Sequence, residues 1–337
     1  MMDNILKNNI ESEFSLKPKA VLVHDPTKFD VFTQFTHLTR EEIQEYFLFR
    51  QSPQPELFKS HHQEFVEQLN KEVKSVVYLS DILSLKPSLL NKWQNYLSTN
   101  PNLVYTRDAF ITFPYIPEGY LTGKMGKEIR QREPEIMSEV AQVLGLKEIV
   151  EIPDELVLEG GDVIPFCHGS KRYIIIGYGR RTTKDTLYFL QQKLREKKLI
   201  DGIIGIELAQ WRINLDGGMV PVTEDVIIAH PESLISGMLL DSTETKINPM
   251  QFFQDLGFRF IEVSQEESLH KQACNCFCLG RRKIVAYDLS DRVYNLLRQH
   301  DVEVIRVKGK ELVKGTGGPR CMTRPIYKEI PIGLLQN

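Results

Sequence analysis

The stretch GTGGPRCMTRP, from Gly315 to Pro325, is the most informative part of this sequence. Its three glycines permit positive φ angles and let another molecule approach the backbone closely. Arg320 then places a positive charge beside the thiol of Cys321, and a cation next to a cysteine favours the nucleophilic thiolate. The alternative is a glycine-rich surface turn with a buried and inert cysteine, which is what most single cysteines are.

The composition is that of a globular protein with a sizeable core: 337 residues, 42% hydrophobic and 26% charged. The net charge of −3 gives no reason to expect nucleic acid or an anionic membrane as a partner. No apolar run approaches the ~18 residues that span a bilayer. We predict a cytoplasmic protein with a polar tail or lead-in at residues 1–14, lacking the apolar core of a signal peptide, followed by one domain over residues 15–337.

Five cysteines in a chain of this length do not form a disulfide framework, and the odd count indicates reduced thiols. Cys274, Cys276 and Cys278 alternate, which would place them on one face of a strand. Zinc ligands are usually separated by two or more residues, and no histidine pair lies near. We therefore predict a buried strand here, with no metal and no cofactor.

Strand-like and helix-like runs alternate along the whole chain. The strand-like runs are Ala20–His24, Ser75–Leu79, Glu148–Ile152, Tyr173–Gly177, Gly202–Glu207, Val226–His230, Lys283–Asp288 and Val302–Val307. The helix-like segments are Ser60–Val73, Ile129–Leu144, Thr183–Lys197 and Leu289–His300. This alternation predicts an α/β fold, and no low-complexity linker divides the chain.

Two further stretches carry charged residues in distinctive settings. PNLVYTRD, ending at Asp108, is predicted to be a proline-started strand with a terminal Arg-Asp pair, and such pairs are usually weak surface salt bridges. LEGGDV, which contains Glu159, places an acid before two glycines and is typical of a bulge or tight turn.

Together these stretches resemble the motifs of the arginine deiminases, which belong to the guanidino-modifying (pentein) superfamily. The corresponding family motifs read GRGGPRCM, PN-x-x-F-TRD and LEGGDV, and the resemblance runs in the same order from Lys19 to Cys321. It implies an α/β-propeller of five ββαβ-type modules around a pseudo-fivefold axis, with the active site in the central channel. Only the short stretch of residues 84–100 separates YLSDIL, residues 78–83, from the TRD motif, so we expect no helical insertion domain.

The resemblance also implies catalytic roles for individual residues. Cys321 would attack the guanidinium carbon of the substrate, and Asp108 would bind the guanidinium nitrogens. Asn102 would help to hold the α-carboxylate, with Tyr105 in the place of the family's Phe. Glu159 would contact the guanidinium and support a catalytic histidine.

Several arginines fall at or near positions where the family binds the substrate. GYGRRT, residues 177–182, resembles the family's G-x-SERT and makes Arg181 a carboxylate clamp. KEIRQRE, residues 127–133, resembles a helix start that supplies another arginine, and we favour Arg130 over Arg132. Arg320, beside the nucleophile, is assigned to substrate binding as well.

These residue types suit chemistry on a guanidinium, which is a planar cation with an unreactive carbon. Two carboxylates can grip its nitrogens and align the carbon with a sulfur atom. Thiolate attack gives a tetrahedral adduct, loss of an amine gives an amidino-thioether, and water completes the cycle. An acid/base group near the sulfur, usually His, moves the protons.

The sequence departs from the family pattern at two positions. In WRINLDGG, residues 211–218, Asp216 is retained as the second guanidinium carboxylate, but Asn214 stands where the acid/base His is expected. An amide does not titrate near neutral pH, and losing an acid/base group typically costs about 10²–10⁴ in rate. Thr316 replaces the Arg of GRGG, which indicates an altered substrate tail.

We therefore expect a cysteine-dependent enzyme that hydrolyses a C–N bond of arginine or a related small guanidino compound. Crowded carboxylates, with Glu159 among them, could take over part of the proton transfer. One alternative is an amidinotransferase, in which an amine replaces water. Another is a catalytically impaired protein that binds a guanidino ligand. A homo-oligomer is compatible with each of these hypotheses.

Overall fold

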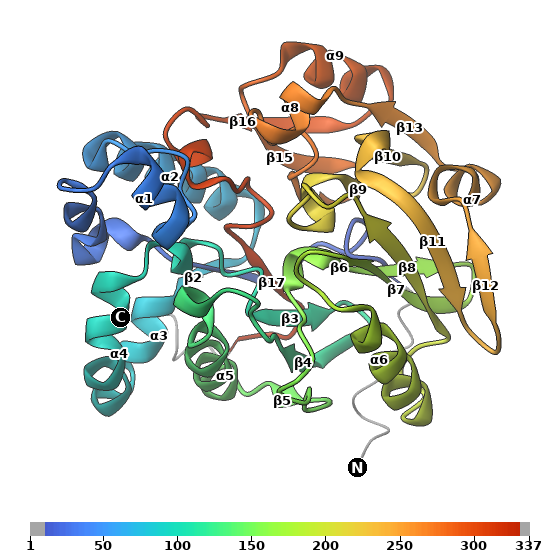
Figure 1. Ribbon diagram of the computed structural model, residues 1–337, viewed down its shortest axis with the longest axis horizontal. Coiled ribbons are helices and arrows are strands. Elements are labelled where there is room, and N and C mark those ends of the chain that lie inside the picture. Colours follow the sequence, from blue (N-terminus) through green and yellow to red (C-terminus); the bar gives the residue numbers. More distant parts are fainter. Residues whose placement is uncertain (1–10, 331–337) are drawn as a thin grey trace.

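The computed structural model describes residues 11–330, which contain five separate β-sheets (Figure 1). The strands are Ala20–Val23 (β1), Ser75–Tyr78 (β2), Phe110–Phe113 (β3), Ile116–Thr122 (β4), Lys147–Glu148 (β5), Val163–His168 (β6), Lys171–Tyr178 (β7), Gly202–Leu208 (β8), Met219–Pro221 (β9), Val226–Ala229 (β10), Leu234–Leu240 (β11), Glu244–Ile247 (β12), Arg259–Glu262 (β13), Phe277–Gly280 (β14), Lys283–Tyr287 (β15), Glu303–Val307 (β16) and Arg324–Ile326 (β17). The sheet orders are β17–β1–β2, β3–β4–β5, β9–β10–β13, β14–β15–β16 and β6–β7–β8–β11–β12.

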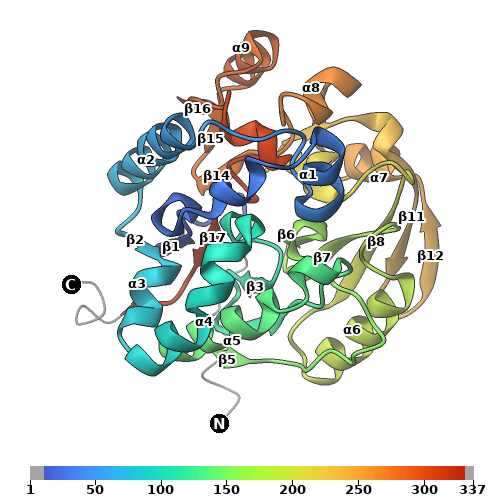
Figure 2. The same ribbon diagram turned by 60° about the vertical axis from the view of Figure 1, so that its left-hand side comes forward.

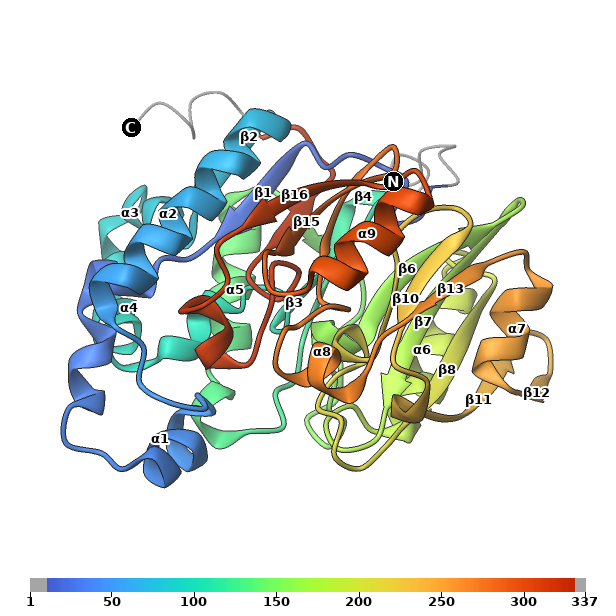
Figure 3. The ribbon, with the colours of Figure 1, turned by 90° about the horizontal axis from the view of Figure 1, so that it is seen from above.

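Nine α-helices accompany these strands within residues 11–330. They are Arg40–Phe47 (α1), Pro55–Glu72 (α2), Leu79–Ser84 (α3), Pro87–Thr99 (α4), Glu133–Val143 (α5), Lys184–Glu196 (α6), Pro249–Asp255 (α7), Gln265–Leu269 (α8) and Asp291–Gln299 (α9). In Figures 1 and 3, α1–α4 lie on one side of the molecule and the five-stranded sheet lies on the other, with α7 outside β11. None of the described helices is long and apolar enough to cross a membrane.

The five sheets share one unit, although the sequence shows no obvious repeat. In each sheet three strands form this unit, and its central strand (β1, β4, β7, β10 or β15) has one antiparallel and one parallel neighbour. In the five-stranded sheet the unit is β6–β7–β8. A parallel pair needs a crossover connection. Helices α2, α5, α6, α7 and α9 each lie in the chain between such a pair. The predicted α/β class is therefore confirmed. The propeller around a pseudo-fivefold axis stays a prediction, since no sheet closes on itself in the described part of the chain.

Most of the predicted runs form the expected elements, but three differ from the prediction. The helix expected from Ile129 begins only at Glu133, because Pro134 is favoured in a first turn and Glu128–Arg130 forms a separate 3₁₀ turn. The strand expected over residues 148–152 is reduced to β5, Lys147–Glu148. Residues 101–104 form a 3₁₀ turn instead of a strand, because the Asn100 side chain caps it by accepting from the Asn102 N–H.

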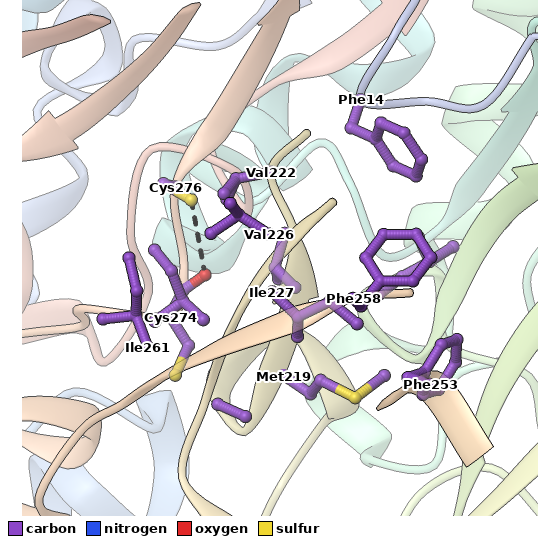
Figure 4. Close-up of a cluster of buried hydrophobic side chains, with 14 of the residues drawn as sticks. Phe14, Met219, Val222, Val226, Ile227, Phe253, Phe258, Ile261, Cys274 and Cys276 are labelled. Atoms are coloured by element: carbon purple, nitrogen blue, oxygen red, sulfur yellow. Dashed lines mark hydrogen bonds between the residues drawn. The ribbon is translucent and has the colours of Figure 1, made fainter. Parts of the chain in front are cut away.

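The alternating cysteines belong to a hydrophobic core, as Figure 4 shows for Cys274 and Cys276. Only Cys278 lies on a strand, β14, so the prediction of one strand through all three was wrong. Cys274 and Cys276 precede β14 in a turn, in which the Cys276 N–H donates to the Cys274 carbonyl at 2.9 Å. Among residues 11–330 no cluster of three or more His, Cys, Asp or Glu side chains has the geometry of a metal site.

The described end of the predicted N-terminal tail is packed against the rest of the protein. Phe14 lies in the same core cluster as these cysteines (Figure 4). Glu13 is buried and forms ion pairs with Arg107 and Arg320 at 3.0 and 3.1 Å. Residues 1–10 of the tail lie outside the described residues.

Candidate active site

Each sheet has a polar segment immediately before the strand that pairs antiparallel with its central strand. The segments carry Asp108 before β3, Glu159 and Asp162 before β6, Asn214 and Asp216 before β9, Asn275 before β14, and Cys321 before β17. Equivalent positions in the five units therefore supply the candidate functional residues. In Figure 1, β17, β3, β6 and β9 lie nearer the middle of the molecule than the helices α5, α6, α7 and α9.

Hydrogen bonds link these segments in a circuit that passes through Ser268 on α8, because no bond joins the Asp216 segment directly to the Asn275 segment among the described residues. The donors and acceptors are Arg107 N to Cys321 O (3.2 Å), Gly160 N to Asp108 O (2.7 Å), Leu215 N to Asp162 Oδ1 (2.7 Å), Ser268 Oγ to Gly217 O (2.7 Å) and Arg320 N to Asn275 O (3.3 Å). Gly160 is required for one of these contacts, since a Cβ atom there would lie 2.1 Å from the Arg107 carbonyl oxygen. The circuit fixes the five segments relative to one another.

A cavity of about 520 Å³ opens between the segments. Eight of the predicted residues line it: Asn102, Tyr105, Asp108, Arg130, Arg181, Asn214, Asp216 and Cys321. Glu159 and Arg320 do not line the cavity; both are buried behind its wall. Tyr105 packs against the glycine-rich turn, and its hydroxyl accepts from the Gly317 N–H at 3.3 Å.

Cys321 is held by two neighbouring side chains. The Asn275 Nδ2 group donates to the Cys321 Sγ atom at 2.9 Å, while the Asn275 Oδ1 atom accepts from the Cys321 N–H at 3.0 Å. The thiol donates to Asp216 Oδ2 at 3.3 Å. Burial raises the pKa of the Cys321 thiol well above its usual value, and the charges of Asp216 and Asp108 raise it further.

Arg320 does not favour the thiolate in the way its position in the sequence suggests. Its guanidinium binds Glu13, Asp216 Oδ2 (3.0 Å) and the Val163 carbonyl (2.9 Å). The pKa of the neighbouring thiol is raised. The expectation of a low thiol pKa was therefore wrong for the ligand-free protein, because burial and the two carboxylates outweigh the arginine.

The two cavity carboxylates each keep an oxygen free of hydrogen bonds from the described residues. Asp108 Oδ2 accepts from Arg130 Nη1 at 2.7 Å, and Asp108 Oδ1 is buried without a partner in residues 11–330. Asp216 Oδ2 accepts from both Arg320 and Cys321, whereas no bond to Asp216 Oδ1 is formed within the same residues. Burial raises the pKa of Asp216, Arg320 opposes this, and Asp108 adds to it. Each carboxylate is paired with an arginine through one oxygen and keeps the other oxygen able to accept a further hydrogen bond.

Asn214 stands where a titratable His was expected, and its amide lies between two carboxylates. Its Nδ2 group donates to Glu159 Oε2 and to Asp162 Oδ2, both at 3.1 Å. Burial raises the pKa of Asp162 well above its usual value, and the charge of Glu159 contributes. No histidine is among the described residues that line the cavity.

The arginines expected to clamp a substrate carboxylate are already engaged by acids. Arg181 Nη1 pairs with Glu159 Oε1 at 2.9 Å. Arg130 pairs with Asp108 and, through Nε and Nη2, with the buried Glu133 at 2.9 and 2.7 Å. Asn102 remains open, because its buried Nδ2 group has no partner in the described chain.

Several lining residues were not singled out from the sequence, and three polar ones among them are Asn275, Arg50 and Arg212. Asn275 could have been found, because it stands two residues before β14, as Asp108 stands two residues before β3. Arg50 and Arg212 lie in segments whose neighbours are set by the fold, and no local signal marks them.

The α/β fold and the order of these motifs place the chain in the guanidino-modifying pentein superfamily. The family model for arginine deiminase matches residues 84–328, about three quarters of the chain, and the chain belongs to the arginine deiminase family. An arginine deiminase of Staphylococcus aureus (strain MRSA252) is 25% identical over 303 residues, covering 80% of this chain and 72% of that protein.

Two solved structures show the same fold. The N-terminal domain of ArgZ bound to product, an arginine dihydrolase from cyanobacteria, matches 93% of this chain and 99% of its own with a TM-score of 0.68 and 16% identity. A mutant of DDAH from Pseudomonas aeruginosa complexed with citrulline matches 92% of this chain and 100% of its own with a TM-score of 0.63 and 16% identity.

Proposed function

We propose that this protein attacks the guanidinium carbon of a small guanidino compound with the sulfur of Cys321, in the first half of a C–N hydrolysis. The observation that carries the proposal is the meeting of Cys321, Asp108 and Asp216 at one cavity, with the sulfur 3.3 Å from Asp216. The arginine deiminase family and its hydrolytic members support this reaction class.

The substrate cation activates the nucleophile in this proposal. A guanidinium between Asp108 and Asp216 offsets the negative charges that hold the thiol pKa high. Asp216 Oδ2 accepts the thiol proton, and the sulfur forms a bond to the guanidinium carbon. A terminal nitrogen then takes that proton and leaves as ammonia, and an amidino-thioether that still carries the substrate tail remains on Cys321. Loss of the tail amine instead would leave a bare amidino group, which is the intermediate of amidino transfer.

The second half of the reaction is where Asn214 matters. Water attack on the thioether needs a base, and an amide cannot accept a proton at neutral pH. We infer that the first half runs faster than the second, so that the Cys321 adduct accumulates. If an amine attacks the adduct faster than water does, the protein is an amidinotransferase. If no adduct forms, it is a guanidino-binding protein.

Mass spectrometry of the intact protein tests the proposal. Incubation with arginine, agmatine or 4-guanidinobutyrate is expected to add the mass of the substrate minus ammonia to the wild type and nothing to Cys321→Ala; a gain of one bare amidino group would instead indicate loss of the tail amine. An assay for ureido products reports hydrolysis, and added glycine or ornithine reports amidino transfer. Equal product from wild type and Cys321→Ala would overturn the role of the sulfur.

We also propose a single domain from residue 15 onward, with its five units arranged as a propeller. The hydrogen bonds that link the five site segments, one of them through α8, support this arrangement.

A further inference from the structure

One wall of the cavity carries two arginines that no acid neutralises. Arg212 is buried; its Nε donates to Ser233 Oγ at 3.1 Å and its Nη2 to Ser268 Oγ at 2.6 Å. Arg50 is half-buried and donates to the Leu269 carbonyl. Neither guanidinium has a carboxylate within 4.0 Å among residues 11–330, unlike Arg130, Arg181 and Arg320.

The two arginines lie close to each other because their contacts are adjacent residues at the end of α8. In Figure 2, α1 and α8 both lie in the upper half of the molecule, and the bond from Arg50, which follows α1, to Leu269 at the end of α8 joins the two segments. Burial lowers the pKa of Arg212; Cys274 and Asp216 oppose this, and the charge of Arg50 adds to it. A pair of like charges facing a cavity is stabilised by an anion between them.

Arg50 is also attached to the turn that contains Thr316. The Arg50 N–H donates to the Lys314 carbonyl at 2.8 Å, and Thr316 Oγ1 donates to the Leu48 carbonyl at 3.5 Å. The small Thr316 side chain lines the cavity beside Arg50. The segment that follows α1 therefore places the Arg50 guanidinium at this wall of the cavity.

The charged residues that line the cavity differ in their pairing. Asp108 and Asp216 are the acids nearest Cys321, and both are paired with arginines. Elsewhere Arg50, Lys127, Arg180 and Arg212 line the cavity without an ion-pair partner among the described residues, and the only other lining acid of that part is the exposed Glu45. A free ammonium group would face these cations with little to bind it.

We propose that Arg50 and Arg212 bind an anionic group on the substrate tail, and that the preferred substrates are guanidino acids without a free ammonium group. This inference rests on the proposed function. Guanidino-carboxylates and Nα-acylated arginines have this chemistry. Arginine keeps an ammonium group, and agmatine has no carboxylate and ends in an amine that is protonated at neutral pH.

Calorimetry on Cys321→Ala tests the inference without turnover. We expect 4-guanidinobutyrate and Nα-acetylarginine to bind at least about tenfold more tightly than agmatine, because a hydrogen bond between charged groups is lost with agmatine. In this background Arg212→Gln and Arg50→Gln should each weaken 4-guanidinobutyrate roughly 10- to 100-fold and leave agmatine unchanged. Arg298→Gln, on the exposed side of α9, is the matched control.

Equal affinity for agmatine and 4-guanidinobutyrate, or the same preference after Arg50→Gln, would overturn the inference. Thermal melting identifies any folding defect of Arg212→Gln, and the half-buried Arg50 then decides the question alone. Glutarate separates the two proposals. If glutarate binds in an Arg212-dependent way and no guanidino compound binds, the anion site stands and the guanidino function fails. If guanidino compounds bind, the wild type forms the adduct and neither arginine substitution has an effect, the guanidino function stands and the anion site fails.

Discussion

Two asparagines define two contrasting regions of the cavity. Asn275 donates its amide to the Cys321 sulfur and accepts from the same residue's N–H, so it supports the nucleophile. Asn214 donates its amide to Glu159 and Asp162, where the family pattern has a titratable group. In terms of the proposed function, the nucleophile region around Asn275 keeps the cysteine, while the proton-transfer region around Asn214 lacks the His that the family pattern has. If the proposal holds, bond formation and turnover are separated in this protein.

The largest expected effect comes from removing the sulfur. Cys321→Ala should lower adduct formation and product release by more than about 10⁴-fold, because no other cysteine is among the lining residues of the described chain. Intact-mass measurement and the ureido assay check this. Cys167→Ala, at a half-buried cysteine that is not a lining residue, is the control.

Restoring a base at position 214 should change the proton-transfer region and leave the nucleophile region as it is. Asn214→His places an imidazole beside Glu159, and hydrolysis should rise by about 10²–10⁴-fold. The rate should acquire an inflection near pH 6.5, the ordinary pKa of histidine, which the wild type lacks. Asn214→Gln keeps an amide and should gain nothing; equal gains in both variants would contradict the role of a base.

Removing the amide that contacts the sulfur should weaken the nucleophile region. Asn275→Ala deletes a donor to the thiolate that is worth about 1.5–3 kcal/mol, so the thiol pKa should rise by roughly 1–2 units. The rate of alkylation by iodoacetamide, measured against pH, reports the change. Asn275→Asp should raise the pKa further by adding a negative charge, and the exposed Asn70→Ala should leave the profile of the wild type intact.

The smallest effect concerns a carboxyl group outside the cavity whose pKa is lowered, in contrast to the raised pKa of Asp216 inside it. Outside it, a hydrogen bond from Arg292 helps to lower the pKa of Glu267 to about 2. Because the folded pKa is lowered, this stabilisation is present above the unfolded value near 4.5 and is lost as the pH falls through about 2. Glu267→Gln should therefore cost roughly 1–3 kcal/mol in urea unfolding at pH 7, and less at pH 3. Glu266→Gln, at an exposed neighbour, should cost almost nothing.

The fold was predictable wherever the chain has a continuous apolar run, because burial on both faces needs one. Ile174 to Ile176 on β7 and Ile203 to Ile206 on β8 are examples. Strands such as β9 and β12 were missed, because the first has three residues and the second is largely exposed. Their pairing comes from neighbours far away in the sequence.

The candidate site was predictable in its residues more than in its partners. Asp108, Asp216, Asn214 and Cys321 meet at one cavity, as the motifs indicated. The arginines were misjudged because their partners are set by tertiary structure. Arg320 binds Glu13, which lies 307 residues away, and no local pattern connects them.

The pairing of β17 with β1 has a consequence for synthesis. Ala20 to Leu22 leave the ribosome early, and their antiparallel partner, Arg324 to Ile326, follows some 300 residues later. Cys321 is made just before that final strand, so a nascent chain holds all the acids before it holds the thiol. The cavity that brings Cys321 to Asp108 and Asp216 is therefore completed only when this last described strand pairs with β1.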